Sequence, residues 1–532
     1  MRDPLSVTVS VQQSEVVSTL VTDRVASKLS TKDPTLWGRE AESEASVRLG
    51  WVDLPVTSRP LLAEIDALRA SLWAEGVDRV VLCGMGGSSL APEVITKTFG
   101  IELQVLDSTD PSVIGDAIGG ALERTVVVVS SKSGGTLETD SQRRAFEQAF
   151  NEAGIDAASR FVVVTDAGSA LEKLALEAGY RRVFRADSNV GGRYSALTAF
   201  GLVPSGLAGV DIGDLLDEAA DVMADLAADR PDNPALVLAA ALAGDRERDK
   251  VVIADEGSAI TGFGDWAEQL IAESTGKQGM GILPVAVEGV HAPEIIGDAP
   301  DVVAAVLSSP EQSAIVGTPL PLVTVSGPLG AQLLLWETAT ALAGRLLGIN
   351  PFDQPDVESA KAAARGLLDH RPEAEAPVFV DGAVEVRGTA GLLAGVDDLT
   401  GAVGALLATC GARGYVAVMA YLNAQRDAPL AGVRSALAKR TGRPTTFGWG
   451  PRFLHSTGQY HKGGPANGVY IQISCDEASD LQIPGRPFSF GTLINAQAAG
   501  DAQVLADHGR PVLRLHLTDP ASGVSQLVEA LS

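Results

Sequence analysis

The sequence predicts an α/β protein built from two doubly wound parallel-sheet units and a smaller C-terminal α/β region. Short apolar runs alternate with amphipathic helical segments, and such alternation is typical of right-handed crossovers between parallel strands. The alternation restarts near Lys250, which indicates a second unit. A proline- and acid-rich stretch over residues 370–377 then separates a third region. We expect a lead-in over 1–47, the two units over 48–205 and 206–368, and the third region over 378–532.

The pattern places the elements of each unit as follows. In the first unit, strands are expected at 79–83, 102–106, 126–129, 161–165 and 182–185, with helices at 92–100 and 171–178. In the second unit, strands are expected at 250–255, 282–287 and 322–325, with helices at 266–274 and 331–347. The third region has candidate strands at 415–420, 469–473 and 512–516. The lead-in carries a helical pattern at 16–29 and Trp37 as a candidate buried anchor.

Composition and charge exclude several function classes. The 532 residues are 45% hydrophobic and 20% charged, which is ordinary globular material. A net charge of −26 disfavours a nucleic-acid partner, and an anionic substrate would need local Lys and Arg residues. The three cysteines are far apart, which favours reduced thiols in a cytosol. The first residues carry no apolar leader, and the apolar stretch at 406–422 is interrupted by Arg413. We therefore expect a soluble cytoplasmic protein without a membrane partner.

The stretch over residues 126–150 gives the first indication of a ligand site. Four consecutive valines predict a buried strand, and Leu137, Phe146 and Phe150 predict the apolar face of a helix that Thr136 would cap. The loop between them contains four hydroxyl side chains, one lysine and two glycines. Because a helix N-terminus presents unpaired backbone N–H groups, this loop suits a phosphate group. Loops of this composition also occur as ordinary strand-to-helix turns.

A dinucleotide site and a metal site are both disfavoured. Gly84 and Gly86 fit a dinucleotide fingerprint and Asp107 stands where a ribose-binding acid is expected, but Ser89 occupies the third glycine position. The sequence has no HExxH motif, and His455 and His461 lie in a glycine-bearing stretch without acidic ligands. We therefore expect no cofactor and no metal ion.

Two stretches carry a resemblance to a known family. Residues 189–195 (NVGGRYS) and 350–361 (NPFDQPDVESAK) resemble the two signature stretches of glucose-6-phosphate isomerases. Residues 84–88, 131–136 and 273–277 resemble further motifs of that family and follow the same order. Taken alone, each motif is a weak signal of function. The local pattern predicts a surface position for Glu273, before the helix end at Gly276, and an exposed helix beginning at Lys361. As an ordered set over residues 48–368 they are far more specific.

The resemblance implies a fold, an activity and a set of site residues. It implies two sugar-isomerase (SIS) domains of flavodoxin-like topology, a homodimer, and interconversion of glucose 6-phosphate and fructose 6-phosphate. The residues expected to hold the sugar's 6-phosphate are Gly87, Ser88, Ser131, Lys132, Ser133, Thr136 and Gln269. The resemblance also implies Glu273 as the base, Arg193 as the charge stabiliser, and Gln354 with Lys361 as contacts to the ring end of the sugar. The third region resembles the carboxyl end of family members fused to transaldolase.

The implied chemistry suits these residue types. Aldose–ketose exchange moves a proton between adjacent carbons through an enediolate, and one carboxylate of raised pKa can carry it. An arginine that never loses its own proton suits the developing oxyanion. Two alternatives stay open on these residues. One is a broader isomerase that also accepts mannose 6-phosphate, and the other is a SIS-type sensor that binds a phosphosugar without turnover.

The sequence departs from the family pattern at the residue that opens the sugar ring. Leu333 stands where the family carries a histidine, and Ala196, Phe200 and Asp356 differ at other signature positions. The stretch at 455–464 offers two histidines in a glycine-bearing loop of the kind that approaches ligands closely. We expect the third region to fold this loop over the site, so that His461, with Lys462 nearby, takes the ring-opening role. A surface loop with solvated histidines is the competing interpretation.

Overall fold

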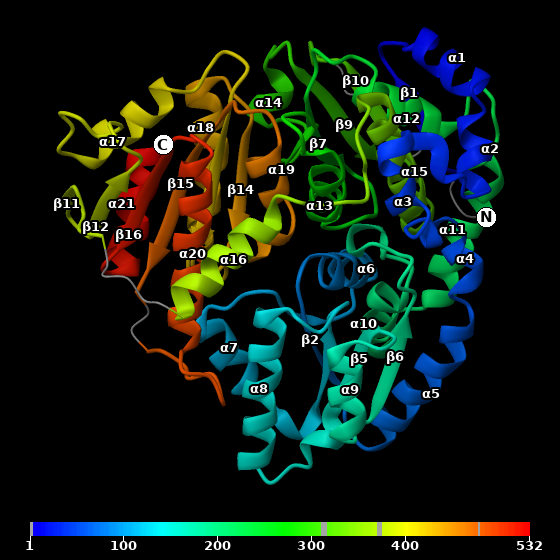
Figure 1. Cartoon of the computed structure of the whole chain (residues 1–532), viewed down its shortest axis with the longest axis horizontal. Helices are drawn as coiled ribbons and strands as arrows, with labels where there is room; N and C mark the ends of the chain where they lie inside the picture. Colours follow the sequence, from blue (N-terminus) through cyan, green and yellow to red (C-terminus); the bar gives the residue numbers. More distant parts are fainter. Residues whose placement is uncertain (1–3, 310–316, 370–374, 477–478) are drawn as a thin grey trace.

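The computed structural model describes residues 4–309, 317–369, 375–476 and 479–532, which form three α/β units around three sheets (Figure 1). The predicted fold class is confirmed. Every predicted strand is present within two residues of its expected bounds, while β1, β9, β11, β12 and β14 were not predicted. No helix in the described ranges combines the length and the apolar character that a bilayer span requires.

The first unit contains a five-stranded, wholly parallel sheet with strand order β3-β2-β4-β5-β6. Its strands are β2 (Arg79–Gly84), β3 (Gln104–Leu106), β4 (Thr125–Ser130), β5 (Phe161–Asp166) and β6 (Arg182–Ala186). One face is covered by α7 (Pro111–Ile118), α8 (Leu137–Glu152) and α9 (Ala170–Glu177). The other face is covered by α5 (Pro60–Ala74), α6 (Leu90–Thr98) and α10 (Ala199–Ala208). The valines of β4 are buried on both faces, which explains why this strand has no polar alternation.

The second unit includes the lead-in of the chain. Its sheet has the order β1-β10-β9-β7-β8, in which β1 (Ser6–Val9) pairs antiparallel with β10 (Leu322–Ser326). The other strands are β7 (Lys250–Glu256), β8 (Leu283–Ala286) and β9 (Val302–Ser308). Its helices of eight or more residues are α1 (Ser14–Thr22), α11 (Ile212–Leu226), α12 (Pro234–Ala243), α13 (Phe263–Thr275) and α15 (Leu329–Leu347). The shorter helices are α2 (Val25–Ser30), α3 (Arg39–Ala45), α4 (Leu54–Thr57) and α14 (Pro293–Ile296). Trp37 is buried, and its indole N–H donates to the Ala341 carbonyl at 2.7 Å, as an anchor would.

The third unit has a six-stranded mixed sheet with the order β11-β12-β16-β15-β13-β14. The strands β13 (Tyr415–Tyr421), β14 (Thr445–Trp449), β15 (Gly468–Cys475) and β16 (Val512–Leu517) are parallel to one another. The hairpin of β11 (Phe379–Asp381) and β12 (Val384–Gly388) adds antiparallel to β16. The helices are α17 (Leu399–Ala408), α18 (Val433–Thr441), α19 (Gly458–Gly463), α20 (Phe490–Asp507) and α21 (Pro520–Leu531).

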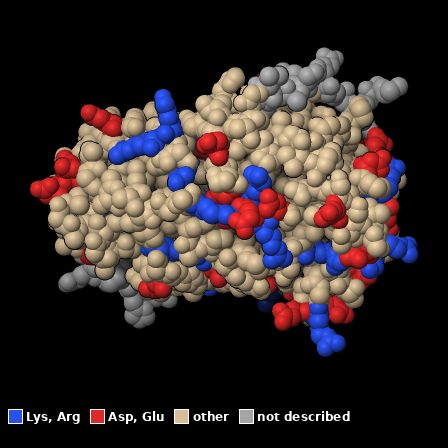
Figure 2. Space-filling model, turned by 90° about the horizontal axis from the view of Figure 1, so that it is seen from above, with Lys and Arg blue, Asp and Glu red and all other residues tan. Residues whose placement is uncertain are grey.

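The third unit is fixed against the other two by packing and by ion pairs. Helix α16 (Val357–Asp369), which follows the second unit, packs along α20 of the third (Figure 1). Arg452, in a 3₁₀ helix over Arg452–His455, bonds Glu93 and Asp107 of the first unit and Asp265 of the second at 2.5–3.2 Å. From above, Lys and Arg side chains lie interspersed with Asp and Glu (Figure 2). The three units therefore meet around the segment that begins at Arg452.

Candidate active site

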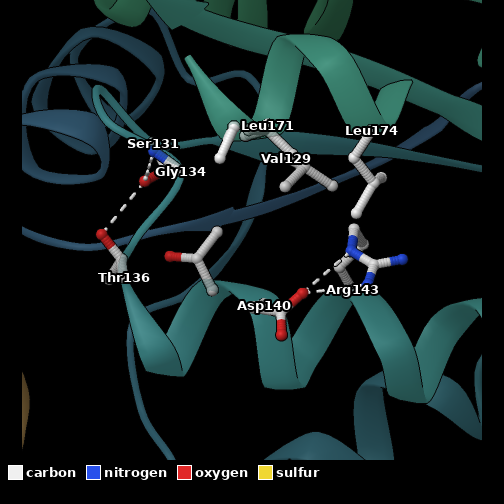
Figure 3. A pocket seen from close by; sticks show the side chains of 10 residues that line it. Val129, Ser131, Gly134, Thr136, Asp140, Arg143, Leu171 and Leu174 are labelled. Carbon is white, nitrogen blue, oxygen red and sulfur yellow. Dashed lines mark hydrogen bonds and ion pairs between the residues drawn. The ribbon is translucent and has the colours of Figure 1, made fainter. Parts of the chain in front are cut away.

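The loop between β4 and α8 has the form expected of a phosphate-binding loop. The hydroxyls of Ser131 and Thr136 lie 3.0 Å apart and turn towards each other across it (Figure 3). The Gly134 N–H donates to the Ser131 hydroxyl at 3.2 Å, and the Gly135 N–H donates to the Ser133 hydroxyl at 3.2 Å. Thr136 is the N-cap residue of α8, as predicted, but its side chain makes no capping hydrogen bond. The first N–H groups of α8 are thus left to face the loop.

A small cavity of about 150 Å³ lies behind this loop, and buried charges brace its far wall (Figure 3). The guanidinium of Arg143 bonds the Asp140 carboxylate at 2.9 Å and the Tyr180 hydroxyl at 2.9 Å. Arg143 is 3% exposed, so these bonds are shielded from water. The network fixes the first turns of α8, and with them the direction of its N-terminus.

The two glycine loops pack backbone against backbone. Gly87 follows β2, and a Cβ atom added to it would lie 2.0 Å from the Gly192 carbonyl oxygen. A side chain at Gly87 is therefore excluded by the loop that carries Arg193. Ser88, the neighbour of Gly87, is partly exposed beside this contact. The close approach brings the first strand loop and the first signature stretch to one place.

Arg193 and Glu273 form a buried pair at the centre of the site. Glu273 lies in the last turn of α13, and its Oε2 is 3.2 Å from Nε of Arg193. The Arg193 Nη1 donates to the Glu273 carbonyl at 2.6 Å, and its Nη2 donates to Oε1 of Gln354 at 2.6 Å. Gln269, one turn before Glu273, directs its amide towards the same carboxylate at 3.4 Å. The structure therefore brings together four residues that the sequence predicted as a set.

The environment of Glu273 raises the pKa of its carboxyl. Burial is the largest cause, and the positive charges of Arg193, His455, Lys361 and Lys277 oppose it without cancelling it. Glu273 is 5% exposed, which excludes the alternative that it is a solvated surface residue at a helix end. A carboxyl of this kind can accept and return a proton near neutral pH.

The third unit adds a histidine to the same site. Nε2 of His455 lies 3.1 Å from Oε1 of Glu138, the second residue of α8. Burial acts to raise the Glu138 pKa, but the hydrogen bond and charge of His455 outweigh it, so that this pKa is lowered. Gln497 of α20 donates to the same Oε1 at 2.7 Å. Because Glu138 stays ionised and accepts, Nε2 of His455 is the donor in this pair.

A cavity of about 510 Å³ lies between the phosphate loop, α16, α20 and the segment that contains His455. It is lined from all sides of the junction, by Ser133, Gly135, Thr136, Leu137, Glu138, Lys361, Ala364, Arg365, Leu454, His455, Lys462, Leu493 and Gln497. The backbone of His455 also approaches Gly86: a Cβ atom there would lie 3.0 Å from the His455 carbonyl and 2.7 Å from the Gln269 amide. The phosphate loop, Lys361 and His455 thus line one cavity. The Arg193–Glu273 pair does not line it and is connected to it through the contacts of Gln269 and His455 at Gly86.

Comparisons with known proteins show the family of the chain. Residues 66–278 match the family described as phosphoglucose isomerase. The glucose-6-phosphate isomerase of Cyanothece sp. is 31% identical over 368 residues, which cover 57% of this chain and 68% of that protein. The chain belongs to the glucose-6-phosphate isomerase family. The enzyme of the same name from Synechococcus elongatus is 31% identical over 349 residues, covering 54% of this chain and 66% of its own length.

Solved structures resemble about two thirds of the chain. A hypothetical protein from Thermus thermophilus superposes with a TM-score of 0.57 at 25% identity, covering 66% of this chain and 96% of that one. A glucose-6-phosphate isomerase from Chlamydia trachomatis superposes with a TM-score of 0.55 at 19% identity, covering 68% of this chain and 87% of that one, and supports the fold alone. The chain spans about two thirds of the length of the curated glucose-6-phosphate isomerases it matches.

His461 does not lie where the sequence suggested. Its Nδ1 is 2.9 Å from the Tyr415 hydroxyl, and its ring stacks on Tyr415 and meets Tyr470 edge-on. Burial lowers the pKa of His461 to about 3, so this imidazole stays neutral at pH 7. It does not line the cavity that His455 lines. This geometry does not support the role expected of His461 and turns attention to the other histidine of the same stretch.

Two lysines of the predicted set have partners of their own. Lys132 bonds Asp166 at 2.6 Å and the Ser188 carbonyl at 3.2 Å, so its ammonium lies over the end of β5. Lys462 lines the cavity but is paired with the buried Asp501 of α20. The expected convergence of Ser88 with the hydroxyls of the phosphate loop stays a prediction.

Of the positions expected to depart from the family pattern, Leu333, Ala196 and Phe200 lie in the core, whereas Asp356 is partly exposed. Leu333, which stands in place of the family histidine, is fully buried on α15. His455 and Glu138 were not predicted for the site, although two signals were present. Glu138 follows Thr136 by two residues, and His455 shares a polar, glycine-bearing stretch with His461. Across the described ranges, the structure gathers no group of three or more His, Cys, Asp or Glu side chains that could hold a metal ion.

Proposed function

We propose that the protein is a glucose-6-phosphate isomerase that interconverts glucose 6-phosphate and fructose 6-phosphate by enediolate proton transfer. The observation that carries the proposal is the buried Arg193–Glu273 pair beside a loop of hydroxyls at a helix N-terminus. The membership of the family and the relatives named glucose-6-phosphate isomerase support the same reaction.

Glu273 is the base of the proposed reaction. It removes a proton from C2 of the open-chain aldose and returns it to C1, which yields the ketose; the reverse direction uses the same carboxyl. Burial raises the pKa of this carboxyl, which brings its basicity closer to that needed at neutral pH. The Gln269 amide, one helical turn away, orients the carboxylate for both transfers.

Arg193 stabilises the negative charge of the enediolate. Three carbonyl oxygens, of Glu273, Pro351 and Asp353, accept from its Nη1 at 2.6–3.2 Å, so the guanidinium cannot reorient. A charge fixed before the reaction stabilises the transition state without reorganisation at the moment of transfer. The second signature stretch supplies two of these carbonyls as well as Gln354, which explains why both stretches belong to one site.

The phosphate is held at the N-terminus of α8. The hydroxyls of Ser131, Ser133 and Thr136 and the N–H groups of the loop are the donors, and we place Gly87 and Ser88 of the neighbouring glycine loop at its edge. The ammonium of Lys132 contributes its charge from the end of β5. Such contacts bind substrate and transition state alike, so they set KM more than kcat.

We assign ring opening to His455 in place of the histidine lost at position 333. With its Nε2–H donated to Glu138, the Nδ1 atom of His455 accepts the proton of the sugar's anomeric hydroxyl and delivers it to the ring oxygen as the bond between C1 and the ring oxygen breaks. The hydrogen bond to the Glu138 carboxylate holds the imidazole in the orientation that this transfer needs. Lys361 lines the same cavity and contacts the ring end of the sugar together with Gln354.

The wider expectations belong to the same proposal. We infer a cytoplasmic enzyme that acts as a homodimer on a small sugar phosphate, without a nucleic-acid partner. Light scattering on the purified protein tests the dimer. Acceptance of mannose 6-phosphate is the second candidate activity, and no residue of the site distinguishes the two sugars.

The direct test is a coupled assay that follows conversion of fructose 6-phosphate to glucose 6-phosphate. The expected result is turnover that the Glu273→Gln variant lacks. A phosphosugar sensor would bind fructose 6-phosphate in the same preparation without forming product, and that outcome would replace the proposal. A parallel assay with mannose 6-phosphate tests whether the protein also isomerises that sugar phosphate.

A further inference from the structure

A groove of about 1060 Å³ lies in the third unit, apart from the candidate active site. Strands β12, β15 and β16 form its floor, and α16 and α20 form one wall. Figure 1 shows α20 lying beside β15 and β16. The wall is built largely from small side chains, including Ala363, Ala496, Ala499, Ala502 and Ala506. Small residues facing the sheet explain why space is left there, but the chemistry of the groove comes from its floor.

The floor of the groove places two arginines directly opposite each other. Arg387 of β12 is the register partner of Arg514 of β16 in an antiparallel pair. Like charges at directly opposed positions destabilise a sheet unless an anion lies between them. The next pair along the same face joins Glu385 with His516, whose Nδ1 lies 3.0 Å from the Ser474 hydroxyl of β15. This row lies towards the carboxyl ends of β15 and β16, where parallel sheets bind ligands.

The chain itself supplies a carboxylate to the arginine pair. Nη1 of Arg514 bonds Oε2 of Glu375 at 2.6 Å, and Nε of Arg387 donates to the Glu375 carbonyl at 2.8 Å. Glu375 belongs to the short segment between α16 and β11. Its side chain is 63% exposed, and exposed ion pairs contribute little free energy. Arg387 is held more firmly, because it is 12% exposed and also bonds Glu385 at 2.7 Å. Glu375 is thus a replaceable anion beside two arginines, of which Arg387 is held in place by Glu385 and Arg514 is 33% exposed.

We propose that this groove binds a small dianion, a phosphate ester or a dicarboxylate, at Arg387 and Arg514, and that Glu375 occupies the place of that ligand in its absence. The planar guanidinium groups suit either oxyanion in a bidentate contact. His516, Ser474 and Thr389 line the groove and supply further donors to the rest of the ligand. Helix α16 borders both this groove and the cavity that contains Lys361, so the two sites share a wall.

Calorimetric titration of the full chain with inorganic phosphate and, separately, with succinate tests the proposal. The phosphate loop of the first unit can also take inorganic phosphate, so the comparison is made between variants. Arg514→Gln should weaken one binding event at least about tenfold, the loss expected for a charge-assisted contact. Arg182→Gln, an exposed arginine paired with Glu64, is the matched control and should titrate like the parent. Turnover of fructose 6-phosphate should be unchanged in Arg514→Gln, which separates this test from that of the isomerase.

Glu375→Gln gives the second and sharper measurement. Its side chain is mostly exposed, so the variant should fold, and loss of the internal competitor should tighten the groove's affinity for the dianion about threefold or more. Binding of both probes identifies the shared dianion chemistry, and binding of succinate alone identifies a dicarboxylate site. Identical titrations for the parent, Arg514→Gln and Glu375→Gln would mean that the network only tethers the segment before β11, and would overturn the proposal.

Discussion

The first two units and the third unit supply the candidate active site in different ways. The first two units, which contain the family match over residues 66–278, place their site residues at strand ends and helix ends. These are a loop before α8, a carboxylate at the end of α13 and an arginine beside a glycine contact. The third adds His455 on a short 3₁₀ helix that Arg452 holds by ion pairs to both other units. In the proposed mechanism, proton transfer between carbons therefore depends on the first two units, and ring opening depends on the third unit.

Two histidines of the third unit, His455 and His461, show the same kind of difference on a smaller scale. His455 and His461 are six residues apart, yet one borders the cavity beside Glu138 and the other stacks within a tyrosine cluster. Position relative to the unit boundary, and not residue type, decides which of them can reach a substrate. Substitutions in the framework should affect every substrate form, whereas substitutions at the added histidine should affect closed sugars alone.

The largest effect is expected at Glu273. Glu273→Gln keeps the shape and removes the base, so kcat should fall at least about a hundredfold on cyclic and open-chain substrates alike. Binding of fructose 6-phosphate, measured by calorimetry, should persist. Near-parent turnover in this variant would mean that another group moves the proton and that Glu273 is not the base.

Arg193→Lys should lower kcat somewhat less than Glu273→Gln does. A lysine keeps the charge but cannot reproduce the contacts that fix the guanidinium, so we expect kcat to fall by roughly tenfold or more. Steady-state kinetics on both substrate forms measure the effect. A rise in KM with unchanged kcat would place Arg193 among the binding residues instead.

Thr136→Ala should act on affinity. Removing one hydroxyl from the phosphate loop weakens ground state and transition state equally, so KM should rise about tenfold while kcat changes little. Thr139→Ser, a conservative change on the buried side of the same helix turn, is the matched control. An unchanged KM would show that the phosphate lies elsewhere.

The smallest effect on turnover is expected at His461. Its folded pKa of about 3 lies below the ordinary value of 6.5, so the native state holds fewer protons than the unfolded state between these pH values. Stability should therefore fall as pH drops below 6.5, and this histidine should contribute about 1.4 kcal/mol per pH unit. Urea unfolding of His461→Gln at pH 7 and pH 5 should show a smaller pH dependence than the parent. If the stability of both proteins depended on pH to the same extent, His461 would not be buried in the folded state.

The sequence predicted the framework well because its signals are local. A valine run and a glycine–serine loop each specify their own backbone, so Thr136 could be named from the local pattern, whereas Glu273 and Arg193 were named only through the family resemblance. The edge strand β1 could not be assigned to the second sheet, because its partner β10 lies more than three hundred residues along the chain. The choice between His455 and His461 failed for the same reason. It depends on Tyr415 and Glu138, which no local pattern connects to that stretch.

Turnover of His455→Gln on a cyclic and on an open-chain substrate tests the central claim most directly. Glutamine can still bond Glu138 but cannot exchange the proton, so kcat/KM on the cyclic sugar phosphate should fall about a hundredfold. On an open-chain analogue whose ring-closing hydroxyls are blocked, it should stay within about twofold of the parent, and His461→Gln should leave the ratio of the two substrates unchanged. Equal losses on both substrates, or a selective loss in His461→Gln instead, would contradict the assignment of ring opening to His455.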